Sequence, residues 1–211
     1  MTAAPRLVLA THNAHKVAEL RRILGDASAG LDGVEVVGAD AFPGLGDVAE
    51  TGVTFAENAL LKAHAAARIT GLPSAADDSG LCVAVLGGSP GVFSARWCGR
   101  HGDDRANLEL LLAQLSDVPD EHRRAWFRCA AALALPDGGE HVAHGRLAGS
   151  LARAPRGSGG FGYDPIFVPD GDRRTLAEYA PAEKDAVSHR GRAFRALAPT
   201  LLRVLAAVAH P

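Results

Sequence analysis

The feature that most constrains the fold is the stretch ADDSG at 76–80, where two carboxylates stand side by side between apolar runs. A carboxylate near a protein core loses hydration and repels its neighbour, so the pair is costly unless positive charge lies close to it. The fold must therefore bring a cation to Asp77 and Asp78. Mg²⁺ is one candidate, because it usually takes one or two carboxylates and completes its octahedron with water and substrate phosphates. An ordinary Asx turn is the alternative interpretation.

Hydrophobic patterns on both sides of this stretch predict an α/β fold. Short apolar runs bounded by Gly, Pro and polar residues indicate strands, and apolar residues three and four apart indicate helices. We expect strands over 6–10, 34–37 and 81–86, a hairpin over 125–149, and helices over 11–25, 54–71, 103–115 and 188–208. Thr54 and Glu57 form a T-x-x-E capping box, and Pro199 should kink the last helix. The architecture predicted is a long mixed central sheet flanked by helices, with the acidic pair at strand ends.

Bulk composition narrows the class of protein. A length of 211 residues with 47% hydrophobic content predicts one domain, or two lobes sharing a sheet. The formal charge of −2 argues against a nucleic-acid polymer as partner. Cys82, Cys98 and Cys129 form no C-x-x-C pair, which predicts reduced thiols in a reducing compartment. Since no stretch resembles a signal peptide or a membrane span, we expect a cytoplasmic protein that does not bind a membrane.

The chain contains three lysines, and each lies beside a candidate site segment: Lys16, Lys62 and Lys184. A compact ammonium suits a phosphate oxygen, which makes these positions candidates for binding phosphate. Thr11, Asn13 and Lys16 occupy a strand-to-helix turn, where free backbone N–H groups and the helix dipole attract an anion. Alternatively, Asn13 caps the helix and Lys16 is solvated.

A second polar group is predicted around the helix that begins after Thr54. Asn58 and Lys62 are four residues apart and project from one face of that helix, and Glu50 precedes it. Glu50 is a candidate third oxygen donor to the metal beside Asp77 and Asp78. The alternative is an ordinary exposed face of a helix and an ordinary loop acid.

Gly157, Gly159 and Gly162 match the G-x-G-x-x-G pattern of dinucleotide-binding folds. That fingerprint opens a helix, whereas here a strand-like run follows, so we reject the dinucleotide interpretation. We expect a glycine loop that presents Phe161 for stacking on a base and Asp164 as an acceptor for a base N–H, although a phenylalanine is more often part of a core. The residues SHR at 188–190 open the last helix, where His189 and Arg190 are candidate donors at a pocket rim.

Five motifs together resemble those of the Ham1-like inosine triphosphatase family, in the family's order and from Arg6 to about Leu205. They are THNAHK, ETGVTFAENALLKA, ADDSGLCVAVLGGSPGVFSARWCG, GSGGFGYDPIF and EKDAVSHR. The resemblance implies one two-lobed domain over 1–211 with the active-site cleft between the lobes, homodimerisation, and Mg²⁺-dependent hydrolysis of dITP, ITP and XTP to the monophosphate and pyrophosphate. A related house-cleaning pyrophosphatase acting on other modified nucleotides is the alternative. A nucleotide-binding module without hydrolysis is the non-enzymatic one.

The resemblance also implies roles for individual residues. The triphosphate would be bound by Thr11, His12, Asn13, Ala14, His15 and Lys16, with Asn58 and Ser79 also on the substrate. Glu50 and Asp78 would bind the metal, for which Asp77 is a further candidate; Asp78 would accept the proton, and Lys62 would supply catalytic charge. The base pocket would consist of Phe161, Gly162, Tyr163 and Asp164, closed by Lys184, His189 and Arg190.

Overall fold

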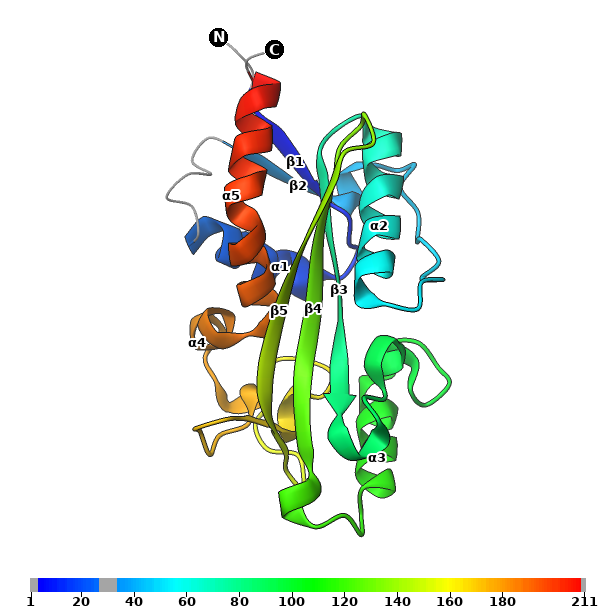
Figure 1. Ribbon diagram of the computed structural model, residues 1–211, viewed down its shortest axis with the longest axis vertical. Coiled ribbons are helices and arrows are strands. Elements are labelled where there is room, and N and C mark those ends of the chain that lie inside the picture. The colour runs from blue at the N-terminus through cyan, green and yellow to red at the C-terminus, as the bar shows by residue number, and fades with distance from the viewer. Residues whose placement is uncertain (1–3, 27–33, 210–211) are drawn as a thin grey trace. The chain divides into compact units, whose positions relative to one another are not determined.

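The computed structural model describes residues 4–26 and 34–209 (Figure 1). Within these residues, six strands form one sheet in the order β2-β1-β3-β4-β5-β6. The strands are β1 Arg6–Leu9, β2 Glu35–Gly38, β3 Ser74–Val83, β4 Arg124–Ala134, β5 Glu140–Leu151 and β6 Phe167–Pro169. The α-helices are α1 Ala14–Asp26, α2 Phe55–Thr70, α3 Asp104–Gln114, α4 Pro181–Val187 and α5 His189–Ala209. Strand β1 pairs in parallel with β2 and β3, while β5 and β6 are antiparallel, so the predicted mixed α/β sheet is confirmed.

The chain divides into two compact units, which are described separately below. The first unit comprises 1–78, 129–145 and 190–211, and the second comprises 79–128 and 146–189. Strands β3, β4 and β5 each contribute residues to both units. The boundary in β3 falls between Asp78 and Ser79, directly after the acidic pair.

In the first unit, helices cover both faces of the sheet (Figure 1). Side chains alternate along a strand, so β4 directs Cys129, Ala131 and Leu133 into a cluster with α1 and α5. The alanines between them pack against the alanines of α2 in a second cluster. Small side chains on both surfaces allow α2 to lie close to the sheet. This packing holds α1, α2 and α5 around the part of β3 that carries the acidic pair.

The second unit has its own core. Leu108 and Leu111 of α3 pack with Leu81 of β3, Phe127 of β4 and Phe167 of β6. A buried arginine supports this core by binding backbone carbonyl groups. The guanidinium of Arg123 donates to the carbonyl oxygens of Leu115, Leu151 and Ala152 at 2.6–3.1 Å. Three chain segments are thereby joined at one side chain.

Most elements lie where the sequence predicts them. Helix α2 has the predicted capping box: the Thr54 side chain accepts from the Glu57 backbone N–H, and the Glu57 side chain accepts from the Thr54 backbone N–H. Gly71 ends the helix at φ +67°. Helix α1 continues to Asp26, one residue beyond the predicted stop at Gly25. Pro199 lies inside α5.

The prediction for the strand after the acidic pair is wrong in its bounds. Strand β3 runs from Ser74 to Val83, so Asp77 and Asp78 lie inside it and not at its end, and Ala84–Leu86 form a 3₁₀ helix. The strand passes through two carboxylates because alternation directs them to opposite faces, where different cations neutralise each one. The two acids therefore have different surroundings.

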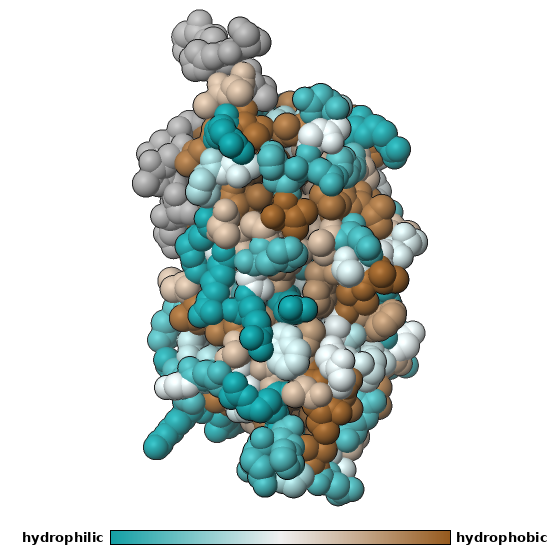
Figure 2. Space-filling model, in the orientation of Figure 1, coloured by the Kyte–Doolittle hydropathy of each residue, from teal (hydrophilic) through white to brown (hydrophobic). Residues whose placement is uncertain are grey.

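The displayed surface carries polar and apolar residues side by side (Figure 2). Among the described residues, the exposed large hydrophobic ones are Val53, Leu61, Ile69, Val85, Phe93 and Leu110. Within the described residues, none of the helices is both long and apolar enough to cross a membrane.

Candidate active site

Asp77 is a member of a buried ion-pair network on the α1 and α5 face of β3. Its Oδ2 lies 3.2 Å from Lys16 Nζ and 3.1 Å from Arg190 Nε, and Arg190 Nη1 lies 2.7 Å from Glu19 Oε2. Burial alone raises the pKa of Asp77, but Lys16 and Arg190 more than offset it and hold that pKa well below its usual range. The cations that neutralise the charge of Asp77 are thus the side chains of Lys16 and Arg190.

Asp78 faces the other side of β3, toward α2. Its Oδ2 accepts from Asn58 Nδ2 at 3.0 Å, and its Oδ1 lies 3.8 Å from Lys62 Nζ. The same ammonium donates to Glu50 Oε1 at 2.6 Å. Burial raises the pKa of Asp78, and the negative charge of Glu50 adds to this effect, whereas Lys62 opposes it. The structure therefore brings together Glu50, Asn58, Lys62 and Asp78 as the sequence predicts.

The carboxylates around Lys62 fit a divalent cation. Among the described residues, no three His, Cys, Asp or Glu side chains converge on one point as a complete protein cage. Mg²⁺ does not require such a cage, because one or two carboxylates and substrate phosphates suffice. Burial lowers the pKa of Lys62, but Asp77, Asp78 and Glu50 outweigh it and raise that pKa, so this position favours positive charge. Glu50 and Asp78 are the residues suited to hold the metal.

Asn58 is completely buried and contacts protein groups at both ends of its amide. Besides donating to Asp78, it accepts at Oδ1 from the Gly52 backbone N–H at 2.8 Å. A Cβ on Gly52 would lie 2.7 Å from Asn58 Oδ1 and 2.6 Å from Glu57 Cβ, so this approach requires glycine. Asn58 therefore joins Asp78 to the loop that carries Glu50. These two hydrogen bonds position Asp78 and the loop, and the contact of Asn58 with substrate stays a prediction.

The strand-to-helix turn at 11–16 has the geometry of a helix cap. Asn13 Oδ1 accepts from the Lys16 backbone N–H at 3.2 Å, and Thr11 Oγ1 accepts from the Asn13 N–H at 3.2 Å. His12 lies 3.1 Å from Asp40, whose hydrogen bond raises the pKa of the imidazole. The side chains of Ala14 and His15 lie outside the described part of the chain. Capping by Asn13 leaves Lys16 attached to Asp77, at the start of α1.

In the second unit, Asp164 is the centre of the predicted base pocket. Its buried Oδ2 accepts from the Phe161 backbone N–H at 2.9 Å and from Lys184 Nζ at 2.6 Å. Lys184 Nζ also lies 4.7 Å from the centroid of the Phe161 ring. The structure thus brings Phe161, Asp164 and Lys184 together. Because Oδ2 is engaged by protein donors, Asp164 orients the loop and the lysine, in addition to any contact with a base.

Two residues expected at a pocket rim are buried. The His189 ring stacks on Phe127 with centroids 4.7 Å apart, and Arg190 is 1% exposed within the network of Asp77 and Glu19. Tyr163 is also buried and donates its hydroxyl to the Ser94 carbonyl, while Ser79 is half-buried on β3. Sequence analysis missed Glu19, although its position three residues after Lys16 on α1 places both on one helix face.

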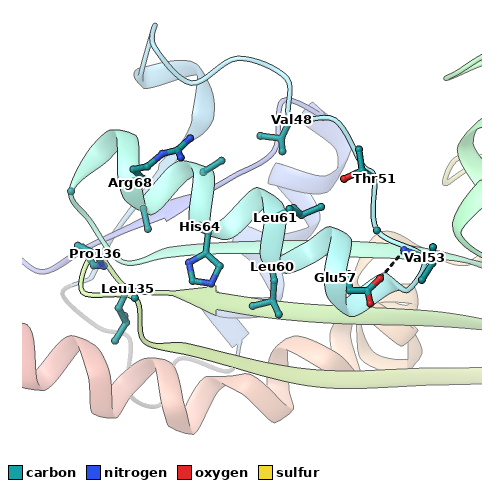
Figure 3. Close-up of a pocket in the computed structure, with 15 residues that line it drawn as sticks. Val48, Thr51, Val53, Glu57, Leu60, Leu61, His64, Arg68, Leu135 and Pro136 are labelled. Atoms are coloured by element: carbon teal, nitrogen blue, oxygen red, sulfur yellow. Dashed lines mark hydrogen bonds between the residues drawn. The ribbon is translucent and has the colours of Figure 1, made fainter.

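A separate groove of about 980 Å³ lies in the first unit along α2 (Figure 3). Leu60, Leu61 and Leu135 give it an apolar lining, and His64 lies 2.7 Å from Glu140 beside it. Thr51, Gly52 and Val53 also line it, but none of the predicted site residues does. The groove therefore borders the loop of Glu50 without containing the candidate catalytic residues.

Comparisons with known proteins show the family to which the chain is similar. The model of the Ham1 family matches residues 7–200. The chain is 66% identical to a protein of Streptomyces coelicolor over 200 residues, covering 95% of this chain and 98% of that one. It is 57% identical to a protein of Mycobacterium tuberculosis over 201 residues, covering 95% and 97%. Both relatives are named dITP/XTP pyrophosphatase.

Solved structures show the same similarity. The crystal structure of a nucleoside-triphosphatase, dITP/XTP pyrophosphatase, from Mycobacterium abscessus matches with a TM-score of 0.73 and 56% identity, covering 92% of this chain and 99% of that one. A HAM1 protein from Coxiella burnetii matches with a TM-score of 0.83 and 41% identity, covering 94% and 99%.

Proposed function

We propose, since this chain belongs to the Ham1 family, that it hydrolyses dITP, ITP and XTP to the nucleoside monophosphate and pyrophosphate. The observation that carries the proposal is the buried Asp78 carboxylate, bracketed by Asn58 and close to a lysine that also binds Glu50. A buried carboxylate that lies beside positive charge is suited to accept a proton, and the positive charge is suited to bind phosphate. The names of two relatives support dITP and XTP as substrates.

The cofactor that we propose is Mg²⁺, held by Glu50 and Asp78. When bound, it neutralises charge on the phosphate oxygens, which phosphoryl transfer requires. Lys16 and Lys62 add two positive charges on the triphosphate. Asp78 orients a water molecule and accepts its proton, while the bond between the α and β phosphoryl groups breaks and pyrophosphate leaves with the bonding electrons. The water oxygen forms the new bond to the α phosphorus, so it remains on the nucleoside monophosphate.

The second unit would bind the purine. Phe161 offers a ring face for stacking, and Lys184, fixed by Asp164, places a cation beside it. A 6-oxo purine presents an acceptor where adenine presents an NH₂ group, so a site with a donor at that position discriminates against adenine. Deaminated purines would therefore be removed from the nucleotide pool.

The proposal extends to a homodimer in the cytoplasm, with no nucleic-acid polymer or membrane as partner. These statements follow from the family resemblance, the net charge of −2 and the cysteine pattern. Sedimentation of the purified protein tests the dimer: a monomer at all concentrations up to 100-fold above those used for activity would reject it.

The proposed reaction is tested by product analysis with a panel of triphosphates. Purified protein is incubated with Mg²⁺ and dITP, XTP, ITP, dATP, dGTP or a modified pyrimidine triphosphate, and pyrophosphate and orthophosphate are measured separately. We expect pyrophosphate as the first product from dITP, XTP and ITP, little from dATP, and none with Asp78→Asn. Orthophosphate as the first product would reject the reaction, and preference for a modified pyrimidine would favour the alternative house-cleaning enzyme.

A further inference from the structure

We infer that Asp104, on α3 and outside the sequence motifs of the site, positions the purine-binding loop, defined here as Gly160–Asp164. The inference rests on the proposed function, because it concerns the loop to which the base pocket is assigned. Gly162 donates its backbone N–H to Asp104 Oδ2 at 2.8 Å, across 58 positions of sequence. This N–H belongs to the peptide group that joins Phe161, the proposed stacking residue, to Gly162.

The purine-binding loop needs an external anchor because its own backbone is permissive. Gly160 and Gly162 have φ of +71° and +60°, a region that side chains other than glycine rarely adopt. Glycine in such a segment leaves many conformations accessible before folding. Without fixed contacts on its peptides, the loop would not hold the Phe161 ring in one orientation.

Asp104 is held on a well-packed element. It is the first residue of α3, whose start is capped by the neighbouring Asp103 through the Ala106 backbone N–H at 3.0 Å. Leu108 and Leu111 anchor the helix in the core of the second unit. The Asp104 carboxylate therefore offers the loop a fixed acceptor, while its neighbour Asp103 caps the helix and pairs with Arg100 at 2.8 Å.

A second anchor connects the same loop to β3. The Tyr163 hydroxyl donates to the Ser94 carbonyl at 2.9 Å, and Ser94 Oγ accepts from the Leu81 backbone N–H at 2.9 Å. A Cβ on Gly80 would lie 2.4 Å from Ser94 Oγ, so the glycine of ADDSG is needed for this approach. Ser94 thus fixes the Tyr163 side, and Asp104 fixes the peptide that carries Phe161.

The consequence is a role in binding and selecting the base. Loss of the Asp104 contact would release the Gly162 peptide and let the Phe161 ring sample orientations that do not stack on the purine. Substrate would then bind less tightly, and discrimination between purines would weaken. Once substrate is bound, the step at Asp78 would proceed at nearly the same rate.

The test compares Asp104→Ala, Asp104→Asn and the matched control Asp103→Ala, each in the full chain. Asp104→Ala should raise KM for dITP about fivefold, as expected for one hydrogen bond to a charged group near the surface, with kcat changed less than about twofold. It should also lower the ratio of kcat/KM for dITP to that for dATP. Asp104→Asn keeps an oxygen that accepts from Gly162, so its KM should stay within about twofold of wild type.

Asp103→Ala removes the helix cap and not the loop contact, so it should lower Tm and leave KM for dITP unchanged. Calorimetry adds a readout independent of turnover: Asp104→Ala should weaken dIMP binding about fivefold and leave pyrophosphate binding unchanged. An unchanged KM and dIMP affinity in Asp104→Ala would overturn the inference, as would equal effects of Asp103→Ala. Failure of the proposed function is distinguishable, because wild-type protein would then release no pyrophosphate from dITP.

Discussion

Replacing Asp77 by Asn tests whether this carboxylate stabilises the fold. The change keeps the size of the side chain and removes the charge shared by Lys16 and Arg190. Removing one partner from a buried ion pair typically costs about 3–5 kcal/mol, because the remaining charge stays buried. Arg190 keeps Glu19 as a partner, and the Lys16 side chain is 17% exposed, so we expect the lower end, about 3 kcal/mol. For a chain of this size, that corresponds to a fall in Tm of about 6–12 °C.

The pH dependence of this effect has a defined sign. The pKa of Asp77 is lower in the folded protein than in the unfolded chain, so its ionised form stabilises the fold above the unfolded pKa of about 4. The Tm difference between wild type and Asp77→Asn should therefore be constant from pH 7 to pH 5. It should start to narrow as the pH falls below about 4, because wild type then loses the stabilisation that the variant lacks.

Thermal unfolding of wild type, Asp77→Asn and the adjacent Asp78→Asn provides the measurement. Burial raises the pKa of Asp78, so its charge destabilises the fold at neutral pH and Asp78→Asn should not lower Tm by more than about 2 °C. A Tm of Asp77→Asn within about 2 °C of wild type would refute the reasoning. Equal destabilisation by both substitutions would refute it too, because the two neighbours would then not differ in role.

Three further substitutions test other parts of the structure. Gly52→Ala should push the loop of Glu50 away from Asn58 and raise the Mg²⁺ concentration for half-maximal activity about tenfold. A Mg²⁺ titration of activity checks this, and an unchanged titration would show that the loop tolerates a Cβ. Asp164→Asn should weaken dIMP binding about tenfold in calorimetry, because Lys184 loses its charged partner, and an unchanged affinity would remove Asp164 from the pocket. Arg123→Met should lower Tm by about 4–8 °C, because three hydrogen bonds to backbone carbonyls are lost, and it should leave KM for dITP unchanged; a raised KM would link Arg123 to the site.

The elements of the fold could be predicted where local signals are strong. The capping box of Thr54 and Glu57 and the glycine at 71 define both ends of α2, and all three act through neighbouring residues. The extent of β3 could not be predicted in the same way. Two adjacent carboxylates locally favour a turn, and the strand continues through them because distant cations neutralise each face.

The candidate site shows the same division between local and distant signals. The grouping of Asp78 with Lys62 and Glu50 follows from the helix period and the need of a carboxylate for a cation. The burial of Arg190 against Glu19 depends on contacts between residues 171 positions apart, for which one sequence contains no signal. From the sequence alone, an arginine beside a serine at a helix start is expected at the surface. Arg190 is buried because α1 packs against it.

Metal binding by the two adjacent acids tests the central claim, which is that Asp78 faces the metal and Asp77 does not. Mn²⁺ serves as the probe, measured by electron paramagnetic resonance with purified wild type, Asp77→Asn, Asp78→Asn and Glu50→Gln at a temperature where all are folded. We predict that Asp77→Asn binds Mn²⁺ within about threefold of wild type, while Asp78→Asn and Glu50→Gln lose at least about tenfold in affinity. The account would be contradicted if Asp77→Asn lost as much Mn²⁺ affinity as Asp78→Asn. It would also be contradicted if Asp78→Asn bound Mn²⁺ as tightly as wild type.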